Sequence, residues 1–523
     1  MKYTAENTFH RILVSLLLMM VAVILQADDG AVLNRKIQLP KSKESVYKLL
    51  RQVSDKSGYL FIYDSQIINN DKKVKIAKGE YTLREAIYAI TGNNQLKISV
   101  VGNHILLQVA DRTKAHTVIS IEKVDSVEKK FFTFSGAIYD QITDEPLAYS
   151  AVGISNSTIG TISNQDGEFK LILPDSLRHS KVKFTHVGYE SQEVEVGLLA
   201  GQHIRFALEP RIIPLQEVVI RVVEAQEEIN RMLENRKNNY STSPVYLTTF
   251  YREGIDHKKN NIDVTEAVLK MYKTGYDVNV NLDQVKLIKM RRIKSIQESD
   301  TIFTKMKSGI NSCLILDLVK NLPDFLKPEE QNKYEYGHTD ITVVDGRRVN
   351  IISFCQKEYI DEPLFKGQLF IDAENFALIE AHFEINPKFV QQATDLYVRK
   401  KNKDIRLVLQ QARYNVSYKL SNDGIYYVNH IRGDLEFKMK RKRKLFSTPL
   451  YLWFEMVNCM VDTTDVNAFA RKERIPTQNI FSDTKYQYDR NFWGNFNVIL
   501  PEEKLKELII NNLSEVSEDQ IIK

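Results

Sequence analysis

The sequence predicts a multidomain, mainly β protein, with a small α+β domain, an antiparallel β-sandwich and a C-terminal curved antiparallel sheet with helices. Three observations predict this fold class. Residues 34–110 combine apolar residues at helical spacing with short strand-like runs. Residues 132–209 contain short runs of alternating apolar and polar residues separated by turn residues. Residues 222–523 contain longer alternating runs and a few helical stretches.

Composition is typical of a globular protein with several domains. The 523 residues correspond to three or four domains at roughly 150 residues each. The 72 basic and 67 acidic residues leave a net charge of +5, too small an excess to indicate nucleic acid as a partner. Cys313, Cys355 and Cys459 are far apart and odd in number. We therefore expect buried free thiols rather than disulfides or a zinc site.

Residues 1–27 are predicted to be a signal peptide that is cleaved on export. Lys2 and Arg11 precede the apolar run Ile12–Leu25, and Ala27 stands before an acidic pair. This run would span about 21 Å as a helix, less than the roughly 30 Å core of a bilayer. A retained membrane anchor is the alternative. We expect an exported protein of the periplasm or the periplasmic face of the outer membrane, with no transmembrane helix after signal removal.

Residues 34–110 form the first predicted domain, with the order helix, strand, strand, helix, hairpin. Gly58 ends a first helix whose apolar residues recur at helical spacing. Thr82 is the predicted N-cap of a second helix, and Glu85 completes a capping box. Gly92 is the predicted end of that helix.

This segment resembles the secretin and TonB short N-terminal (STN) domain. The resemblance rests on VSDKSGYLFIYDSQII, on VKIAKGEYTLREAIYAITG and on the closing ISVVGNHILL, in that order and spacing. It implies a periplasmic module that binds other envelope proteins, such as a TonB-dependent system, and it carries no catalytic residues. Residues 111–131 mix charges without Gly or Pro and are predicted to be a linker, with an edge strand as the alternative.

Residues 132–209 resemble the carboxypeptidase regulatory-like domain, a transthyretin-like β-sandwich. Their turn residues recur every eight to twelve positions, which is typical of a small antiparallel sandwich. The resemblance rests on the patterns from Gly136 to Leu147 and from Thr161 to Phe169, and on Gly188-Tyr189. The family name implies no activity here, because no histidine begins the HxxE pair that zinc carboxypeptidases use. We expect no catalytic residues, no metal and no cofactor, and hence no enzyme.

One stretch of this domain could be interpreted as a metal loop. Asn164, Asp166 and Glu168 place three oxygen-bearing side chains around Gly167. A calcium loop needs about six or seven oxygen ligands, whereas the chain here continues at once with strand-like alternation. Asp-Gly is also a strong hairpin-turn dipeptide. We therefore predict a turn between two strands.

Residues 222–523 are the last predicted domain. A helix near residue 229 opens it, and long alternating strands follow, two of them joined by an Asn422-Asp423-Gly424 turn. The pattern VDGRRVNIISF followed by FKGQLFIDAENFAL resembles the half-barrel of periplasmic lipoprotein carriers and related Bacteroidetes envelope proteins. The frequent aromatic residues indicate an ordinary strand core, with an apolar pocket for acyl chains as the alternative.

A basic run near residue 440 is the sharpest local charge feature. We interpret it as a solvated strand end and turn, with a contact to anionic lipid as the alternative. The residues that would make this contact are Lys438, Lys440, Arg441, Lys442, Arg443 and Lys444.

Together these observations predict a non-enzymatic binding or adaptor protein of the cell envelope. It would bind partner proteins through residues 34–110 and hold a lipid or glycan in residues 222–523. The domain pairing also resembles the front end of Bacteroidetes TonB-dependent transporters, so a truncated transporter or a small outer-membrane barrel component is one alternative. Charged residues within several strands argue against it. An envelope hydrolase with an unrecognised site is the other alternative.

Overall fold

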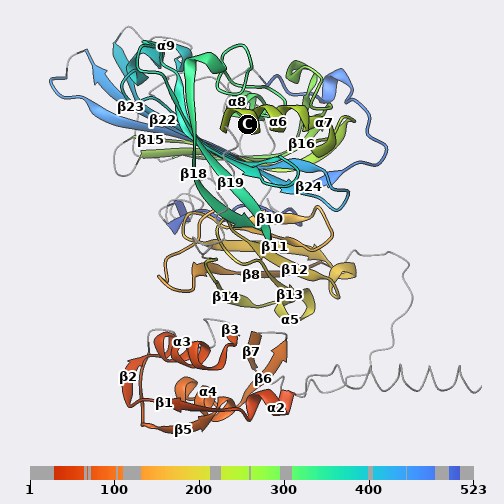
Figure 1. Cartoon of the computed structure of the whole chain (residues 1–523), viewed down its shortest axis with the longest axis vertical. Helices are drawn as coiled ribbons and strands as arrows, with labels where there is room; N and C mark the ends of the chain where they lie inside the picture. The colour runs from red at the N-terminus through yellow and green to blue at the C-terminus, as the bar shows by residue number, and fades with distance from the viewer. Residues whose placement is uncertain are drawn as a thin grey trace, which may run out of the picture. The chain divides into compact units, whose positions relative to one another are not determined.

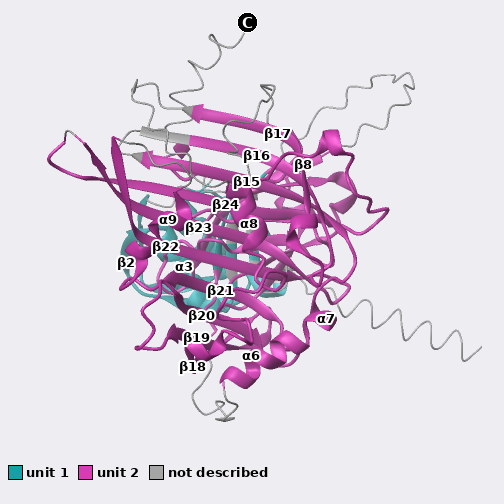
Figure 2. Cartoon of the chain, turned by 90° about the horizontal axis from the view of Figure 1, so that it is seen from above, with its two compact units in different colours: residues 1–128, 202–207 teal, residues 129–201, 208–523 magenta. Residues whose placement is uncertain are grey.

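The computed structural model describes most of the chain (Figure 1). The described residues are 29–63, 68, 72–101, 104–109, 131–211, 225–257, 261–294, 309–398, 404–442, 444–477, 494–503 and 505–506. The predicted signal peptide and all but the last residue of the predicted linker lie outside them. The chain divides into unit 1, residues 1–128 with 202–207, and unit 2, residues 129–201 with 208–523 (Figure 2).

The predicted fold class is confirmed. Strands dominate the described residues, the largest sheet is antiparallel throughout, and the helices are short and few. None of the described helices is long and apolar enough to cross a membrane.

Unit 1 contains three small sheets packed against helices. The sheets pair β1 with β5, β2 with β4, and β7 with both β3 and β6. Val53, Ile87 and Ile90 are fully buried in its core. The elements are α2 (Asp29–Leu33), β1 (Lys36–Leu39), β2 (Ser42–Ser45), α3 (Val46–Ser57), β3 (Leu60–Tyr63), β4 (Lys73–Ile76), β5 (Gly79–Thr82), α4 (Leu83–Thr91), β6 (Leu96–Val101) and β7 (His104–Val109).

Both longer helices of unit 1 end as the sequence predicts, and α4 also begins as predicted. Thr82 and Glu85 form the expected capping box, with hydrogen bonds of 2.9 and 3.2 Å. Gly58 and Gly92 end α3 and α4 in the left-handed conformation, at φ of 77° and 68°. The second of the two strands predicted between these helices is divided into β4 and β5. The division arises because the two halves pair with different strands, β2 and β1.

Seven described strands between residues 131 and 208 form a sandwich of two sheets. One sheet has the order β10-β9-β12-β13 and the other β11-β8-β14. Between them Phe169 meets Phe134 and Phe184 edge to face, with ring centroids 6.0 and 5.7 Å apart. The elements are β8 (Phe131–Asp140), β9 (Ala151–Ile154), β10 (Gly160–Ile162), β11 (Glu168–Pro174), η1 (Asp175–Leu177), β12 (Lys181–Thr185), β13 (Gln192–Glu195), α5 (Val196–Leu199) and β14 (His203–Leu208).

The Asp166-Gly167 turn joins β10 to β11 as predicted, but it is not a hairpin turn. The two strands belong to different sheets, so the turn carries the chain from one side of the sandwich to the other. The Asn164 Oδ1 atom accepts hydrogen bonds from the N–H groups of Asp166, at 3.0 Å, and Glu168, at 2.8 Å. Gly167 has φ of 76°, and a β-carbon there would lie 2.5 Å from the carbonyl oxygen of Ile138. The position therefore requires glycine.

The rest of unit 2 is built on one antiparallel sheet of ten described strands. Its order is β17-β16-β15-β24-β23-β22-β21-β20-β19-β18. The strands are β15 (Val245–His257), β16 (Asn261–Lys273), β17 (Gln284–Lys294), β18 (Tyr334–Val344), β19 (Arg347–Gln356), β20 (Phe365–Asp372), β21 (Leu378–Ile385), β22 (Ile405–Leu420), β23 (Tyr426–Arg441) and β24 (Thr448–Asp462). The helices are α6 (Ala225–Glu234), α7 (Arg236–Asn239), η3 (Val280–Leu282), α8 (Gly309–Ile315), η4 (Gln331–Lys333), η5 (Val390–Ala393), α9 (Thr394–Tyr397) and η6 (Arg471–Glu473).

Different parts of the chain cover the two faces of this sheet (Figure 1). The face that carries Phe383 and Tyr414 is here called the helix face, because α6 and α8 pack on it. The face that carries Phe250 and His430 is called the sandwich face. Side chains of the sandwich, such as Tyr149, lie against it.

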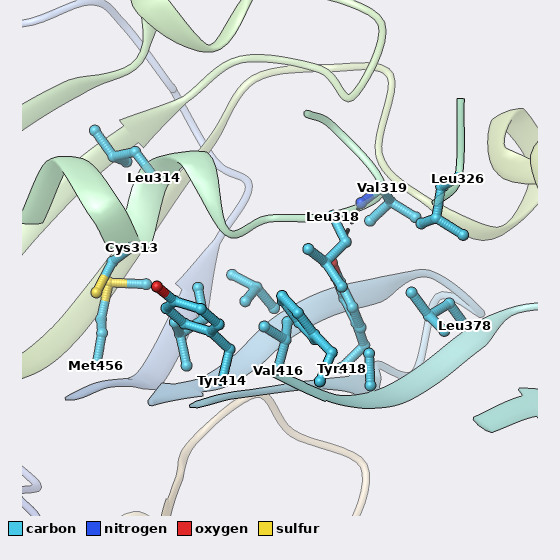
Figure 3. Packing of buried hydrophobic residues seen from close by; sticks show 14 of the residues in the cluster. Cys313, Leu314, Leu318, Val319, Leu326, Leu378, Tyr414, Val416, Tyr418 and Met456 are labelled. Atoms are coloured by element: carbon cyan, nitrogen blue, oxygen red, sulfur yellow. Dashed lines mark hydrogen bonds between the residues drawn. The ribbon is translucent and has the colours of Figure 1, made fainter. Parts of the chain in front are cut away.

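Aromatic side chains on the helix face form a packed core. Phe325 stacks on Phe354 with ring centroids 4.3 Å apart and lies 5.2 Å from the ring of Phe383. In Figure 3, α8 and the segment after it lie over Tyr414 and Tyr418 of β22. These aromatic residues therefore form an ordinary strand core, as the sequence predicts.

The cysteines follow the prediction in part. Cys313 and Cys459 are buried free thiols, and Cys313 packs in the helix-face core. Cys355 is also free but exposed, so the prediction was wrong at this position. Cys355 lies on β19, two residues after Ser353, opposite Glu335 of the edge strand β18. Both residues are exposed, so the sandwich does not cover this end of β19.

Candidate functional site

A row of polar residues crosses the sandwich face from one edge to the other. Each strand contributes one residue, which lies directly opposite the residues of the two neighbouring strands. Side chains placed opposite each other in this way are close enough for their charges and dipoles to interact. From β17 to β18 the row is Arg291, Glu266, Arg252, Glu455, Arg432, Asn415, His382, Gln368, Ser353 and Gly337. The first five positions alternate in charge. Removing one charge would therefore take away one of the counterions of each neighbour.

The charged half of the row is buried. Arg252 is 1% exposed and Glu266 and Glu455 are fully buried. The Arg252 Nε atom lies 2.8 Å from a Glu455 carboxylate oxygen, and Arg432 donates to the other oxygen at 3.3 Å. Arg291 donates to Glu266 at 2.5 Å. Burial alone would raise the pKa of Glu455, but Arg252 and the other cations hold it well below its ordinary value.

Tyr149 of the sandwich covers the middle of the row. Its ring stacks on His430 with centroids 4.8 Å apart, and the Arg432 guanidinium lies 5.8 Å from the ring centroid. Tyr149 has φ of 61°, a conformation that a bulky residue adopts only when its surroundings hold it there. The contact therefore depends on a strained backbone position just before β9.

The turn that resembled a metal loop holds the C-terminal segment 494–506. The Asp166 carboxylate accepts from the Glu503 N–H at 3.1 Å, and Asn164 Nδ2 donates to the Pro501 carbonyl at 3.2 Å. Lys506 forms an ion pair with Glu168. Among the described residues, no group of three or more potential metal-binding side chains comes together.

A cavity of about 640 Å³ lies between the sandwich and the ten-stranded sheet. It adjoins the uncharged half of the polar row, since Asn415 and His382 line it. The sandwich contributes Gly153, Lys183 and His186 to the lining, and the sheet contributes further hydroxyl, amide and charged side chains. Most lining groups can therefore form hydrogen bonds with a ligand.

Lys419 is the central cation of this cavity. Its ammonium group lies where a β-carbon at Gly153 would be, so the missing side chain on β9 makes room for it. Burial lowers the pKa of Lys419 to about 8. The nearby carboxylate of Asp345 is paired with Lys183, and no described residue forms an ion pair with Lys419. The ammonium group is thus held next to the cavity without a counterion of its own.

The pKa values of two histidines in the cavity are shifted in opposite directions. Burial lowers the pKa of His186. Burial acts in the same direction on His382, but its hydrogen bond to Glu380 outweighs this and raises the pKa of His382. At neutral pH the cavity therefore combines a neutral imidazole with one that is more readily protonated.

The basic residues predicted from the sequence lie elsewhere. Lys438 and Lys440 are exposed at the end of β23, and Lys442 and Lys444 are exposed in the following loop. Arg441 is partly exposed at the last position of the strand. None of them lines the cavity. Arg443 lies outside the described residues. The solvated strand end and turn are confirmed, and the lipid contact stays a prediction.

Sequence reasoning missed the polar row and the cavity. A signal for the row was present, because Glu455 is the one charge in the apolar run YLWFEMV and Arg252 lies in the strand-like run LTTFYREGI. Charges are rarely buried unless they are paired, so two such residues indicate a buried ion pair. Nothing in the linear sequence indicates that Gly153 and Lys419 come together.

Comparison with known proteins identifies one region. Residues 134–220 match the family model of the CarboxypepD_reg-like domain. This match confirms the resemblance found for residues 132–209. No curated protein sequence matches the chain.

Solved structures similar to the chain have low identity. A LolA superfamily protein from Nitrosomonas europaea is 9% identical, with 47% of this chain and 96% of that chain covered and a TM-score of 0.17. A DUF1329 family protein from Desulfovibrio piger is 11% identical, with 47% and 95% covered and a TM-score of 0.18. At these scores, function has to be argued from the site itself.

Proposed function

We propose that the protein is a non-enzymatic binding protein of the cell envelope, and that the cavity under the CarboxypepD_reg-like sandwich holds a glycan. The observation that carries this proposal is the cavity's position and lining. It lies between two β elements, and polar groups converge on it from both. Concave sites with a few well-placed polar groups are the usual form of a binding site for a small ligand.

A glycan matches this lining better than an acyl chain. Sugars present many hydroxyl groups, which the amide and hydroxyl side chains around Asn415 and Ser417 can bind, together with flat faces that stack on rings such as Tyr149. Apolar side chains such as Val187 and Ile379 line part of the cavity, but the large aromatic cluster around Phe325 packs on the helix face and leaves none of its rings to the cavity.

The ligand is expected to carry a negative charge. Lys419 presents an ammonium group without its own counterion, whereas Glu380 already neutralises the charge that His382 can take. A uronic acid or a phosphorylated sugar would neutralise Lys419.

The geometry of a serine–histidine contact beside the cavity supports the proposal of binding without catalysis. The Ser150 Oγ atom lies 3.1 Å from both His186 Nδ1 and the Leu147 carbonyl oxygen, and Ser150 is fully buried. A ligand in the cavity cannot reach a fully buried hydroxyl group, so the pair does not present a nucleophile to it.

The adaptor role is proposed for unit 1. Its resemblance to the STN domain supports binding to other envelope proteins, and cross-linking in intact cells followed by identification of the attached proteins tests it. Recovery of the protein without any envelope partner would contradict this part of the proposal.

The cavity is tested by titration calorimetry with oligogalacturonate and with an uncharged oligosaccharide of the same length. Ser417→Trp would fill the cavity from β22, whereas Ser353→Trp places the same side chain on the sandwich face outside it. We expect wild type and Ser353→Trp to bind the charged sugar and Ser417→Trp to lose binding. Equal binding by both variants, or no binding of either sugar by the wild type, would overturn the proposal.

A further inference from the structure

The loop that joins β23 to β24 presents two large apolar side chains to solvent. Leu445 is 90% exposed and Phe446 is 84% exposed. Single exposed apolar residues are common on protein surfaces. Two adjacent ones at the end of a hairpin, each almost fully exposed, are an unfavourable arrangement in water unless another surface covers them.

Four exposed lysines precede this apolar pair in the chain. Lys442 and Lys444 precede it in the loop, and Lys438 and Lys440 are exposed on the adjoining end of β23. The side chain between these two strand lysines, Met439, is buried on the opposite face. The alternation of the strand thus directs both lysines to one side.

The hairpin carries this loop away from the body of the sheet. β23 has 16 residues and β24 has 15, and the loop extends beyond the neighbouring strands in Figures 1 and 2. A flat surface could therefore reach Leu445 and Phe446 without meeting the sandwich. The loop is separate from the cavity, so its role does not depend on the proposed glycan.

We propose that the β23–β24 loop docks on a membrane surface that contains anionic lipid. Leu445 and Phe446 enter the boundary between headgroups and acyl chains, and the four lysines bind the phosphates around them. Apolar side chains flanked by basic ones are typical of segments that lie in this boundary. Each lysine adds attraction to an anionic surface, and its long aliphatic stem can follow the apolar side chains inward.

Vesicle flotation with the exported form of the protein tests this proposal. The vesicles contain phosphatidylglycerol in phosphatidylcholine, or phosphatidylcholine alone. We expect the wild type to bind the anionic vesicles and to bind less as salt increases. Leu445→Ser/Phe446→Ser should weaken binding about tenfold or more, because two apolar side chains no longer leave water. Replacing Lys438, Lys440, Lys442 and Lys444 by Gln should remove the preference for anionic vesicles.

Matched control variants test whether the effect is specific to this loop or arises from any exposed apolar or basic side chains. Leu282→Ser/Tyr359→Ser changes two other apolar side chains, 57% and 75% exposed. The replacement of Lys43, Lys75, Lys78 and Lys97 by Gln removes the same charge from exposed positions of unit 1. Both controls should bind as the wild type does.

A spectroscopic variant locates the contact. Phe446→Trp should show a blue shift in emission with anionic vesicles, and Tyr359→Trp should not. Failure of the wild type to bind anionic vesicles would overturn the proposal. So would wild-type binding by the loop variant, which would be expected if the exposed pair instead contacts a protein.

Discussion

The two faces of the ten-stranded sheet are both buried, but in different ways. On the helix face, aromatic and aliphatic side chains pack among themselves, and burial of apolar area stabilises the fold. On the sandwich face, buried charges are arranged in a row, and each depends on its neighbour. The difference indicates that the helix face serves folding, whereas the sandwich face places polar groups next to a cavity.

Truncation of the helix-face core should have the largest effect. Phe325 is fully buried between Phe354, Phe365 and Phe383. Phe325→Ala should lower the free energy of unfolding of unit 2 by about 4 kcal/mol, because it removes apolar area and leaves a cavity. Chemical denaturation followed by circular dichroism measures this. Phe325→Leu, which keeps most of the volume, should be much milder, and an equal loss would indicate that packing is not the cause.

Neutralising one charge on the sandwich face should be nearly as damaging. Glu455→Gln leaves Arg252 and Arg432 buried without their shared carboxylate, so we expect a loss of about 3 kcal/mol. Denaturation of the two proteins at neutral pH measures it. Glu80→Gln breaks an exposed pair with Lys36 and should change the stability far less, because water screens exposed charges.

The pH dependence gives an independent check on Glu455. The pKa of Glu455 is lower in the folded protein than in the unfolded chain. Its ionised carboxylate therefore contributes fully to the free energy of unfolding at pH values above the ordinary glutamate pKa, and this contribution is lost as the pH falls below it. The difference in stability between wild type and Glu455→Gln should therefore shrink in acid. A constant difference would mean that the charge of Glu455 is not what stabilises the row.

Lys419 should affect ligand binding and not stability. Lys419→Met removes the ammonium group over Gly153 but keeps the length of the side chain, so affinity for a uronic acid oligosaccharide should fall about tenfold. Stability should not fall, because a buried charge without a counterion is unfavourable. Wild-type affinity should also decrease as pH rises through about 8, where Lys419 loses its proton, and the variant should not show this step. Titration calorimetry across this pH range tests both.

The sequence predicted local structure better than the site. The helix ends at Gly58 and Gly92 and the Asp166-Gly167 turn could be predicted, because each depends only on residues that are neighbours in the sequence. The partners of most strands could not, because outside hairpins such as the one between β22 and β23 the pairing is decided by residues far apart in the chain. This is why the division of β4 from β5 was missed.

The cavity is a stronger case of the same limit. Gly153 and Lys419 are 266 positions apart and meet only because β9 of the sandwich lies against β22 of the large sheet. A lone glycine in a strand and a lone lysine near a strand end are both ordinary in sequence. Their combination becomes meaningful only once the two elements are placed together.

Replacement of Tyr149 should have the smallest effect on stability. It tests whether the sandwich face serves ligand binding in addition to folding. Tyr149→Leu removes the stacking on His430 and the contact with Arg432, which together contribute about 1 kcal/mol. Tyr149→Phe keeps the ring and should remain within about 0.5 kcal/mol of the wild type. The same ring lines the cavity, so Tyr149→Leu should weaken sugar binding by more than its small effect on stability implies. Denaturation and titration of both variants would show whether this side of the sheet is built for binding. If the two losses are equal, Tyr149 serves packing alone.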